Sequence, residues 1–121
     1  MATILIVDDE SRSREYIGVS LQSFGWQTAT ASNGKDALEK IKLSRPDAIV
    51  LDMTMPEMDG FEIARRLKSN AEFKTIPILA ATGLRSRGDR DRCLAAGCND
   101  YVAKPVSVQE LAQRLKALLA A

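Results

Sequence analysis

The chain has 121 residues, a length that suits one compact domain, so we expect residues 1–121 to form a single domain. Its 17 basic and 16 acidic residues give a net charge of +1, which argues against a partner that is nucleic acid or an anionic membrane. No apolar run approaches the roughly 20 residues of a membrane-spanning helix, and the N-terminus lacks the pattern of a signal peptide, so we expect a cytoplasmic protein.

The sequence contains no histidine and only two cysteines, Cys93 and Cys98. Without histidine, the chain cannot use an imidazole base or carry a phosphohistidine, although it could receive a phosphoryl group from a histidine on a partner. Two thiols without histidine make a poor zinc site. Five residues apart, the cysteines could form a disulfide only in a tight geometry, and we expect both to be small buried apolar residues.

In chain order, the first element is Thr3–Val7, a continuous apolar run that predicts a strand buried on both faces. A helix follows. Its apolar face is predicted at Ile17, Leu21 and Phe24, and its end at Gly25. A weaker strand is predicted at 26–31. Asn33–Gly34 predicts a turn before the second helix, which ends before Pro46.

The third predicted strand is Ala48–Leu51. Asp59 with Glu62 three residues later predicts a capped third helix, because such a pair satisfies free backbone N–H groups at a helix start. The fourth strand is predicted at 76–81. Pro77 lies near its start, where a missing backbone donor is tolerated.

A fourth helix is predicted near residues 85–96, closed by Gly97. This segment carries four arginines: Arg85, Arg87, Arg90 and Arg92. They could bind an acidic partner, or they could form a solvated face, since Asp89 and Asp91 follow two of them at a spacing of four residues.

Residues 100–103 predict the fifth strand, and Ser107 with Glu110 predicts a capping box for the last helix. Five strand–helix units with short connections predict an α/β fold, a doubly wound parallel sheet with helices on both faces. The last helix reaches to within a few residues of Ala121, so we expect no output domain after it.

Chemically distinctive residues follow four of the predicted strands. They are Asp8 and Asp9, Asp52, Thr82, and Lys104. Each alone is an ordinary cap, turn or surface residue. Ligands of open α/β sheets bind at the carboxyl ends of the strands, so the set together predicts a site at that edge.

The predicted site has a consistent chemistry. Three carboxylates close together repel one another, and a hard divalent cation, Mg²⁺ with Mn²⁺ as the alternative, removes that conflict. Asp52 could then attack phosphorus in line. The metal, the Lys104 ammonium, the Thr82 hydroxyl and backbone N–H groups after Asp52 would neutralise charge on the transferred oxygens.

The chain carries four distinctive segments at the predicted strand ends: Val7–Glu10, Val50–Gly60, Ala81–Gly83 and Asp100–Pro105. With these segments it resembles the response-regulator receiver domains of two-component signalling, and the resemblance covers essentially the full length. It implies a flavodoxin-like sheet of order 2-1-3-4-5 with five helices. It also implies phosphorylation by a sensor histidine kinase or a histidine phosphotransfer protein, and signalling to a downstream partner protein.

The resemblance also assigns residue roles. Asp52 resembles the phosphoacceptor, Asp9 the direct metal ligand and Asp8 a ligand acting largely through water. The backbone carbonyl of Thr54 would complete the metal site. Thr82 resembles the switch hydroxyl.

Three further roles follow from the resemblance. Tyr101 is similar to the aromatic residue that turns inward behind the switch hydroxyl. Lys104 would pair with Asp52 at rest and with phosphate in the active state, and Pro105 would follow a cis peptide bond. The surface of the fourth helix, fifth strand and fifth helix would change on phosphorylation.

Other interpretations remain open at this point. The chain could be a stand-alone regulator or a receiver cut from a longer kinase or transcription factor. A dehalogenase-like phosphatase would carry Asp-x-Asp after the first strand, whereas Asp52 follows the third. A flavodoxin would need a phosphate-binding loop where Asp8 and Asp9 lie. We therefore expect a phosphoacceptor switch that promotes only its own phosphorylation and dephosphorylation, and not an enzyme for outside substrates.

Overall fold

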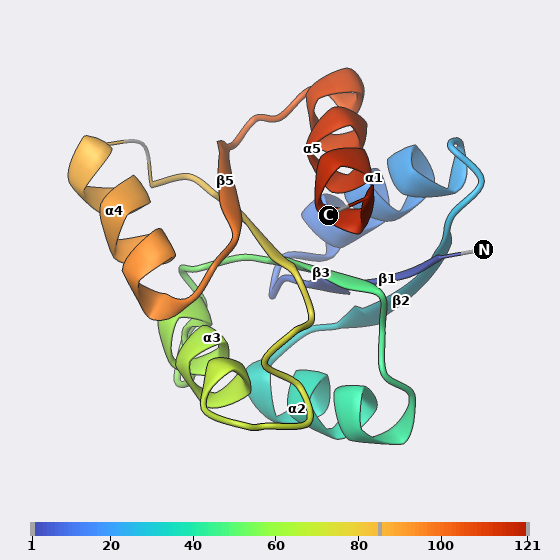
Figure 1. The fold of residues 1–121 in the computed structure, drawn as a ribbon. Helices are drawn as coiled ribbons and strands as arrows, with labels where there is room; N and C mark the ends of the chain where they lie inside the picture. Colours follow the sequence, from blue (N-terminus) through green and yellow to red (C-terminus); the bar gives the residue numbers. More distant parts are fainter. Residues whose placement is uncertain (1, 85, 121) are drawn as a thin grey trace.

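The computed structural model describes residues 2–84 and 86–120, in which strands and helices alternate (Figure 1). The elements are β1 (Thr3–Val7), α1 (Ser11–Gln22), β2 (Gln27–Ala31), α2 (Gly34–Leu43), β3 (Ala48–Leu51), α3 (Gly60–Lys68), β4 (Ile78–Thr82), α4 (Arg87–Ala96), β5 (Asp100–Ala103) and α5 (Val108–Ala120). The strands pair in parallel in the order β2-β1-β3-β4-β5. The predicted doubly wound sheet and its order are confirmed.

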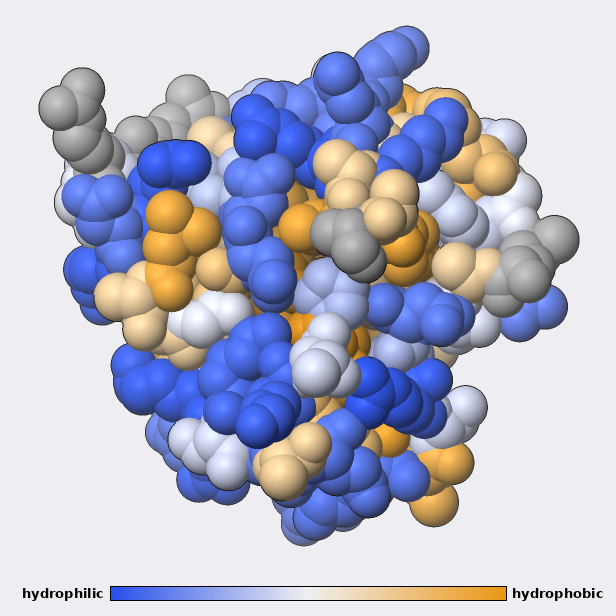
Figure 2. All heavy atoms as spheres, in the orientation of Figure 1, coloured by the Kyte–Doolittle hydropathy of each residue, from blue (hydrophilic) through white to orange (hydrophobic). Residues whose placement is uncertain are grey.

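The helices cover both faces of the sheet, with α1 and α5 on one face and α2, α3 and α4 on the other (Figure 1). Side chains of a strand alternate between faces. Accordingly, Ile4 and Ile6 join a core cluster with α1 and α5 residues, whereas Leu5 and Val7 join a cluster with α2, α3 and α4 residues. Most of the surface visible in the space-filling view is hydrophilic (Figure 2).

The end of α1 differs from the prediction. The helix ends at Gln22, and Phe24 lies beyond it with 40 % of its surface exposed, so its assignment to the apolar helix face was wrong. The backbone N–H groups of Phe24 and Gly25 donate to carbonyls three residues earlier, and Gly25 has a positive φ of 88°. This tightened last turn moves the chain off the helix axis before Phe24.

Two helix starts also differ from expectation. Asn33 caps α2 rather than forming a free turn, because its side chain accepts from the backbone N–H of Asp36 at 2.8 Å. The α4 helix begins at Arg87, where Ser86 and Asp89 form a reciprocal capping box. The helix was predicted near residues 85–96, and residue 85 itself lies outside the described residues. Asp89 therefore serves the cap and also lies 3.6 Å from Arg92.

Several predictions about the core and the caps are confirmed. Cys93 and Cys98 are buried free thiols, as predicted. Asp59 caps α3 through the backbone N–H of Glu62, as predicted. No helix within residues 2–84 and 86–120 is both long and apolar enough to cross a membrane.

Trp26, the residue before β2, lies at the end of the sheet where the strands begin. It is half-buried against the core cluster shared by α1 and α5, and its ring centroid lies 6.1 Å from that of Phe24. The adjacent Gln27 pairs with Thr3, the first residue of β1. Trp26 therefore lies far from the carboxyl ends of the strands.

Side chains satisfy the backbone at this amino edge of the sheet. The Asp47 carboxylate accepts from the Thr3 N–H at 2.8 Å, and the Asn99 side chain accepts from the Ile78 N–H at 2.9 Å. Lys68 Nζ donates to the carbonyls of Lys74 and Ile76, each at 3.0 Å, and to Asn99 at 3.3 Å. The polar groups here are matched, donor to acceptor.

Candidate functional site

The strand register brings the predicted site residues to one edge. Val7 pairs with Leu51, so Asp8 and Asp52 leave neighbouring strands at the same level. The Asp52 N–H donates to the Val7 carbonyl at 2.9 Å, which fixes the start of the loop after β3. Lys104 follows β5 in the same way, with its N–H donating to the carbonyl of Thr82 at 2.8 Å.

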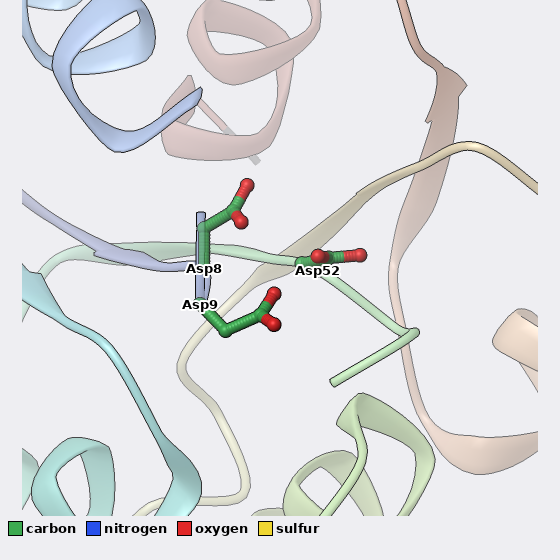
Figure 3. A group of neighbouring side chains, drawn as sticks. All are labelled: Asp8, Asp9 and Asp52. Carbon is green, nitrogen blue, oxygen red and sulfur yellow. The ribbon is translucent and has the colours of Figure 1, made fainter. Parts of the chain in front are cut away.

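The side chains of Asp8, Asp9 and Asp52 lie near one another at the ends of β1 and β3 (Figure 3). One oxygen of each lies within 4.8 Å of the others. Asp8 and Asp52 are buried, whereas Asp9 is exposed. Three oxygen ligands at this spacing suit a hard divalent cation, which prefers one or two carboxylates and keeps water molecules. The donor set therefore fits the predicted Mg²⁺.

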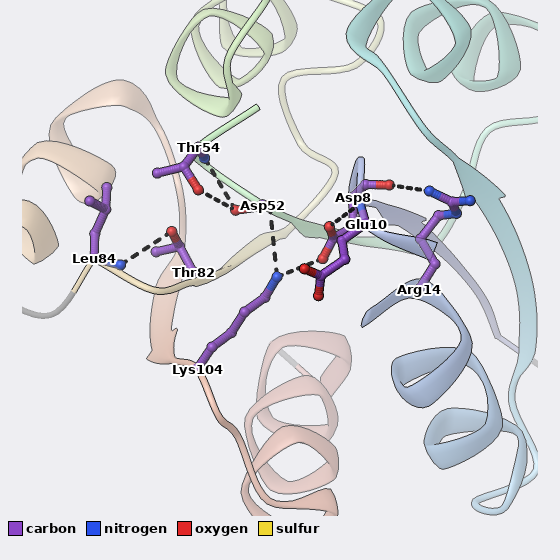
Figure 4. A network of polar contacts seen from close by, with 8 residues as sticks. All are labelled: Asp8, Glu10, Arg14, Asp52, Thr54, Thr82, Leu84 and Lys104. Atoms are coloured by element: carbon purple, nitrogen blue, oxygen red, sulfur yellow. Dashed lines mark hydrogen bonds and ion pairs between the residues drawn. The ribbon is translucent and has the colours of Figure 1, made fainter. Parts of the chain in front are cut away.

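Lys104 lies between two of the carboxylates (Figure 4). Its Nζ is 2.6 Å from Asp8 Oδ2 and 3.7 Å from Asp52 Oδ2. The resting pair predicted for Lys104 and Asp52 is therefore the looser of the two contacts. The other Asp52 oxygen already accepts two hydrogen bonds from Thr54, while Asp8 has an oxygen turned toward the ammonium.

The two buried carboxylates differ in acidity. Burial raises the pKa of Asp8, but hydrogen bonds from Lys104, Ser13 and the Glu10 N–H outweigh it and hold that pKa below its usual value. Burial also raises the pKa of Asp52, and there the donors do not compensate, so its pKa stays above the usual value. Asp52 therefore carries the less stabilised negative charge of the pair.

The loop after β3 holds Asp52 tightly. The backbone N–H and the hydroxyl of Thr54 both donate to Asp52 Oδ1 at 3.1 Å. Backbone N–H groups after Asp52 were predicted to donate to transferred phosphoryl oxygens; here the Thr54 N–H donates to Asp52 itself, and the contact from the Thr54 hydroxyl was not predicted. A Thr two residues after an Asp is a signal for such a local side-chain bond. Gly60 packs so closely that a Cβ there would lie 2.5 Å from the Asp52 carbonyl.

The remaining predicted residues belong to β4, β5 and the segment after β5. Thr82 is fully buried, and its hydroxyl accepts from the Leu84 N–H at 3.4 Å (Figure 4). Tyr101 is half-buried against the core cluster shared by α2, α3 and α4. The Lys104–Pro105 peptide bond is cis. Next to Thr82, the space where a side chain of Gly83 would lie is open within 4 Å.

One further contact was not foreseen from the sequence. The guanidinium of Arg14, from α1, donates to the backbone carbonyl of Asp8 at 2.8 Å (Figure 4). The spacing of six residues gave no signal, because the contact depends on the path of the turn between β1 and α1.

Comparison with known proteins decides the family. The sequence model of the response regulator receiver domain family matches residues 4–116. The chain belongs to this family. Receiver domains are phosphoacceptor switches of two-component systems and are phosphorylated by sensor histidine kinases.

Individual relatives agree with this assignment. The chain is 42 % identical over 116 residues to the response regulator MprA of Mycolicibacterium vanbaalenii, covering 96 % of this chain and 49 % of that protein. It thus spans about half the length of the curated relatives it matches.

Solved structures agree as well. The chemotaxis response regulator CheY4 of Vibrio cholerae superposes with a TM-score of 0.91 at 32 % identity, over 98 % of both chains. The receiver domain of the sensor histidine kinase PA1611 of Pseudomonas aeruginosa PAO1 gives 0.91 and 32 %, over 99 % of this chain and 98 % of that one. That receiver holds a magnesium ion coordinated in its active-site cleft.

Proposed function

We propose that this receiver domain carries a phosphoryl group on Asp52 and uses it to switch a protein-binding surface. The supporting observation is the convergence of Asp8, Asp9 and Asp52 within 4.8 Å, next to the Lys104 ammonium. The phosphodonor is a phosphohistidine on a sensor kinase or a histidine phosphotransfer protein, since receiver domains are phosphorylated by sensor histidine kinases and the sequence contains no histidine. The metal ligands are Asp8, Asp9, Asp52 and the backbone carbonyl of Thr54.

In the transfer step, an Asp52 oxygen attacks phosphorus and forms an O–P bond while the N–P bond to the donor imidazole breaks. The two Thr54 donors hold Oδ1, so Oδ2, the oxygen nearer Lys104, is the nucleophile. Mg²⁺, when bound, supplies positive charge against the transferred oxygens. Lys104 supplies a second positive charge, and the raised pKa of Asp52 makes it a stronger nucleophile than Asp8.

The switch follows from the added charge. A phosphoryl group brings roughly one to two negative charges and several acceptor oxygens. Thr82 gives up its contact with the Leu84 N–H and turns its hydroxyl to the new oxygens, and Tyr101 moves into the space behind it. The surface of α4, β5 and α5 then changes and binds a downstream protein. Since the matched relatives are about twice as long, that partner is a separate protein or a domain of the same polypeptide.

Acetyl phosphate with Mg²⁺, followed by intact mass, tests the chemistry. We expect one phosphoryl group on the wild type and none on Asp52→Asn. Asp91→Asn, which removes an exposed carboxylate from α4, is the matched control and should be labelled like the wild type. Equal labelling of Asp52→Asn and wild type contradicts the proposal. Steady hydrolysis of unrelated phosphoesters would support a phosphatase instead.

Amide hydrogen exchange tests the switch. Phosphorylation should change exchange in α4 and β5 of the wild type. Thr82→Ala should accept phosphate but show a much smaller change, because its side chain has no hydroxyl to follow the phosphoryl oxygens. An unchanged response in Thr82→Ala would remove Thr82 from the switch.

A further inference from the structure

Asp9 is the least restrained member of the carboxylate cluster. It is exposed, and within the described part of the chain no hydrogen bond or ion pair holds its carboxylate. Asp8, by contrast, is fixed by Lys104 and by the Glu10 N–H. The direction of the Asp9 side chain must therefore be set by the backbone that carries it.

That backbone is the peptide plane between Asp8 and Asp9. The Asp8 N–H donates to the Ala31 carbonyl at 3.1 Å, which anchors one side of the residue in the sheet. The Asp8 carbonyl accepts from the Arg14 guanidinium at 2.8 Å. Because a peptide unit is planar, fixing its oxygen also fixes the direction of the N–H and Cα of Asp9.

Arg14 is well placed for this role. It lies in the first turns of α1, its own N–H donates to the Glu10 carbonyl at 3.0 Å, and its side chain is half-buried. None of the ion pairs of the described residues involves it. Its described polar contact is the one to the main chain that precedes Asp9.

We infer that Arg14 is a positioning residue that holds Asp9 in the orientation needed to bind the divalent cation. This inference rests on the proposed metal site. Arg14 does not touch the ion or the phosphoryl group. It acts through the Asp8–Asp9 peptide, as groups that orient metal ligands do in other metal sites.

The charge of Arg14 and its hydrogen bond to the Asp8 carbonyl should have opposite effects on the affinity for a divalent cation, which makes the inference testable. A guanidinium near the site repels a cation, so removing its charge alone would strengthen binding. Losing the hydrogen bond would release Asp9 and weaken binding. Arg14→Gln removes the charge and shortens the side chain so that its amide falls short of the Asp8 carbonyl, whereas Arg12→Gln removes an equal charge from an exposed residue in the same first turn of α1 and leaves the Asp8 carbonyl contact intact.

The measurement is Mn²⁺ binding to the unphosphorylated protein, followed by the electron paramagnetic resonance signal of free Mn²⁺. We expect Arg12→Gln to bind as tightly as wild type or slightly more tightly, and Arg14→Gln to bind about tenfold more weakly, at the lower end of what loss of a ligand-orienting group costs. The metal-induced rise in Tm, measured against each variant's own metal-free Tm, should likewise be smaller for Arg14→Gln. This second readout holds even if that variant is less stable.

The possible outcomes distinguish a failure of the role of Arg14 from a failure of the metal site itself. Equal or tighter Mn²⁺ binding by Arg14→Gln, with a normal wild type, overturns the role of Arg14 and leaves the phosphoacceptor proposal standing. A wild type that binds no Mn²⁺ overturns the metal site and, with it, this inference.

Discussion

The two edges of the sheet treat polar groups in opposite ways. At the amino edge, Lys68, Asn99 and Asp47 each meet backbone groups of opposite character, donor to acceptor. At the carboxyl edge, the buried carboxylates of Asp8 and Asp52 face each other with Lys104 between them. The polar contacts at the amino edge therefore stabilise the fold. The carboxyl edge instead holds like charges that repel one another, and a bound cation or a phosphoryl group changes that repulsion.

This difference can be tested by substitution at each edge. If the comparison is right, removing a polar group from the amino edge destabilises the fold. Removing the poorly stabilised negative charge of Asp52 from the carboxyl edge stabilises it. Stability is measured without metal, in the presence of a chelator, so that metal binding does not contribute.

The largest effect is expected at the amino edge. Lys68→Met should lower the free energy of unfolding by roughly 2–3 kcal/mol, because hydrogen bonds from a charged group are the stronger ones and two carbonyls of the turn before β4 lose their donor. Denaturant titration measures it. Lys74→Met, which removes an exposed ammonium nearby, should change stability little. Similar losses in both variants would contradict the role of Lys68.

A smaller loss is expected where the carboxyl edge is tightly packed. Gly60→Ala would bring a Cβ to 2.5 Å from the Asp52 carbonyl and 2.7 Å from Met53 Cα, so the loop must shift. We expect a loss of about 2 kcal/mol, within the range of overpacking, and slower labelling by acetyl phosphate.

Gly18→Ala is the control for this substitution. Its added Cβ would meet only Ile6 Cδ1 at an ordinary 3.7 Å, and alanine favours a helix, so we expect no loss of stability. Normal stability and labelling in Gly60→Ala would show that the loop adapts freely.

The smallest effect has the opposite sign. The pKa of Asp52 is raised in the folded protein by burial, so its ionised form opposes folding above that pKa, and the penalty vanishes as the pH falls below the unfolded value of 3.8. Asp52→Asn should therefore be more stable than wild type by roughly 1 kcal/mol at pH 7. The gain should shrink as the pH is lowered toward 4. Thermal unfolding across this range measures it.

Asp8 supplies the contrast in the same experiment. Its pKa is lowered, so its charge supports folding above pH 3.8 and that support is lost as the pH falls through the lower folded value. Asp8→Asn should destabilise the protein at pH 7. If Asp8→Asn were more stable than wild type, or Asp52→Asn were not, the two carboxylates would not differ in how their charges affect folding.

The fold and the residues of the site could be predicted from the sequence. The fold follows from the spacing of apolar residues, and the site follows from the residues that come directly after the strands. Thr3–Val7 and Ala48–Leu51 are apolar runs that only a doubly covered parallel sheet buries, and their following aspartates must then meet. The contacts within the site could not be predicted in the same way. Whether Lys104 lies nearer Asp8 or Asp52, and whether Arg14 reaches the Asp8 carbonyl, depends on side-chain paths across three elements.

Element ends were the other weak point, for a local reason. The predicted pairing of Asp89 with Arg85 lies outside the described residues, but the Asp89 carboxylate also accepts from the N–H and hydroxyl of Ser86 in a capping box that was not predicted. Likewise, Phe24 continues the helical spacing of Ile17 and Leu21, but the tightened turn before Gly25 ends the helix first.

The position of Trp26 has a consequence for spectroscopy. It is the single tryptophan of the chain, and it lies level with Ala2, six residue steps or about 20 Å along the strand direction from Asp8. Its fluorescence therefore does not sense an ion directly. Any change in emission when Mg²⁺ or a phosphodonor is added would instead report movement of α1 against α5, on the side of the sheet opposite α4.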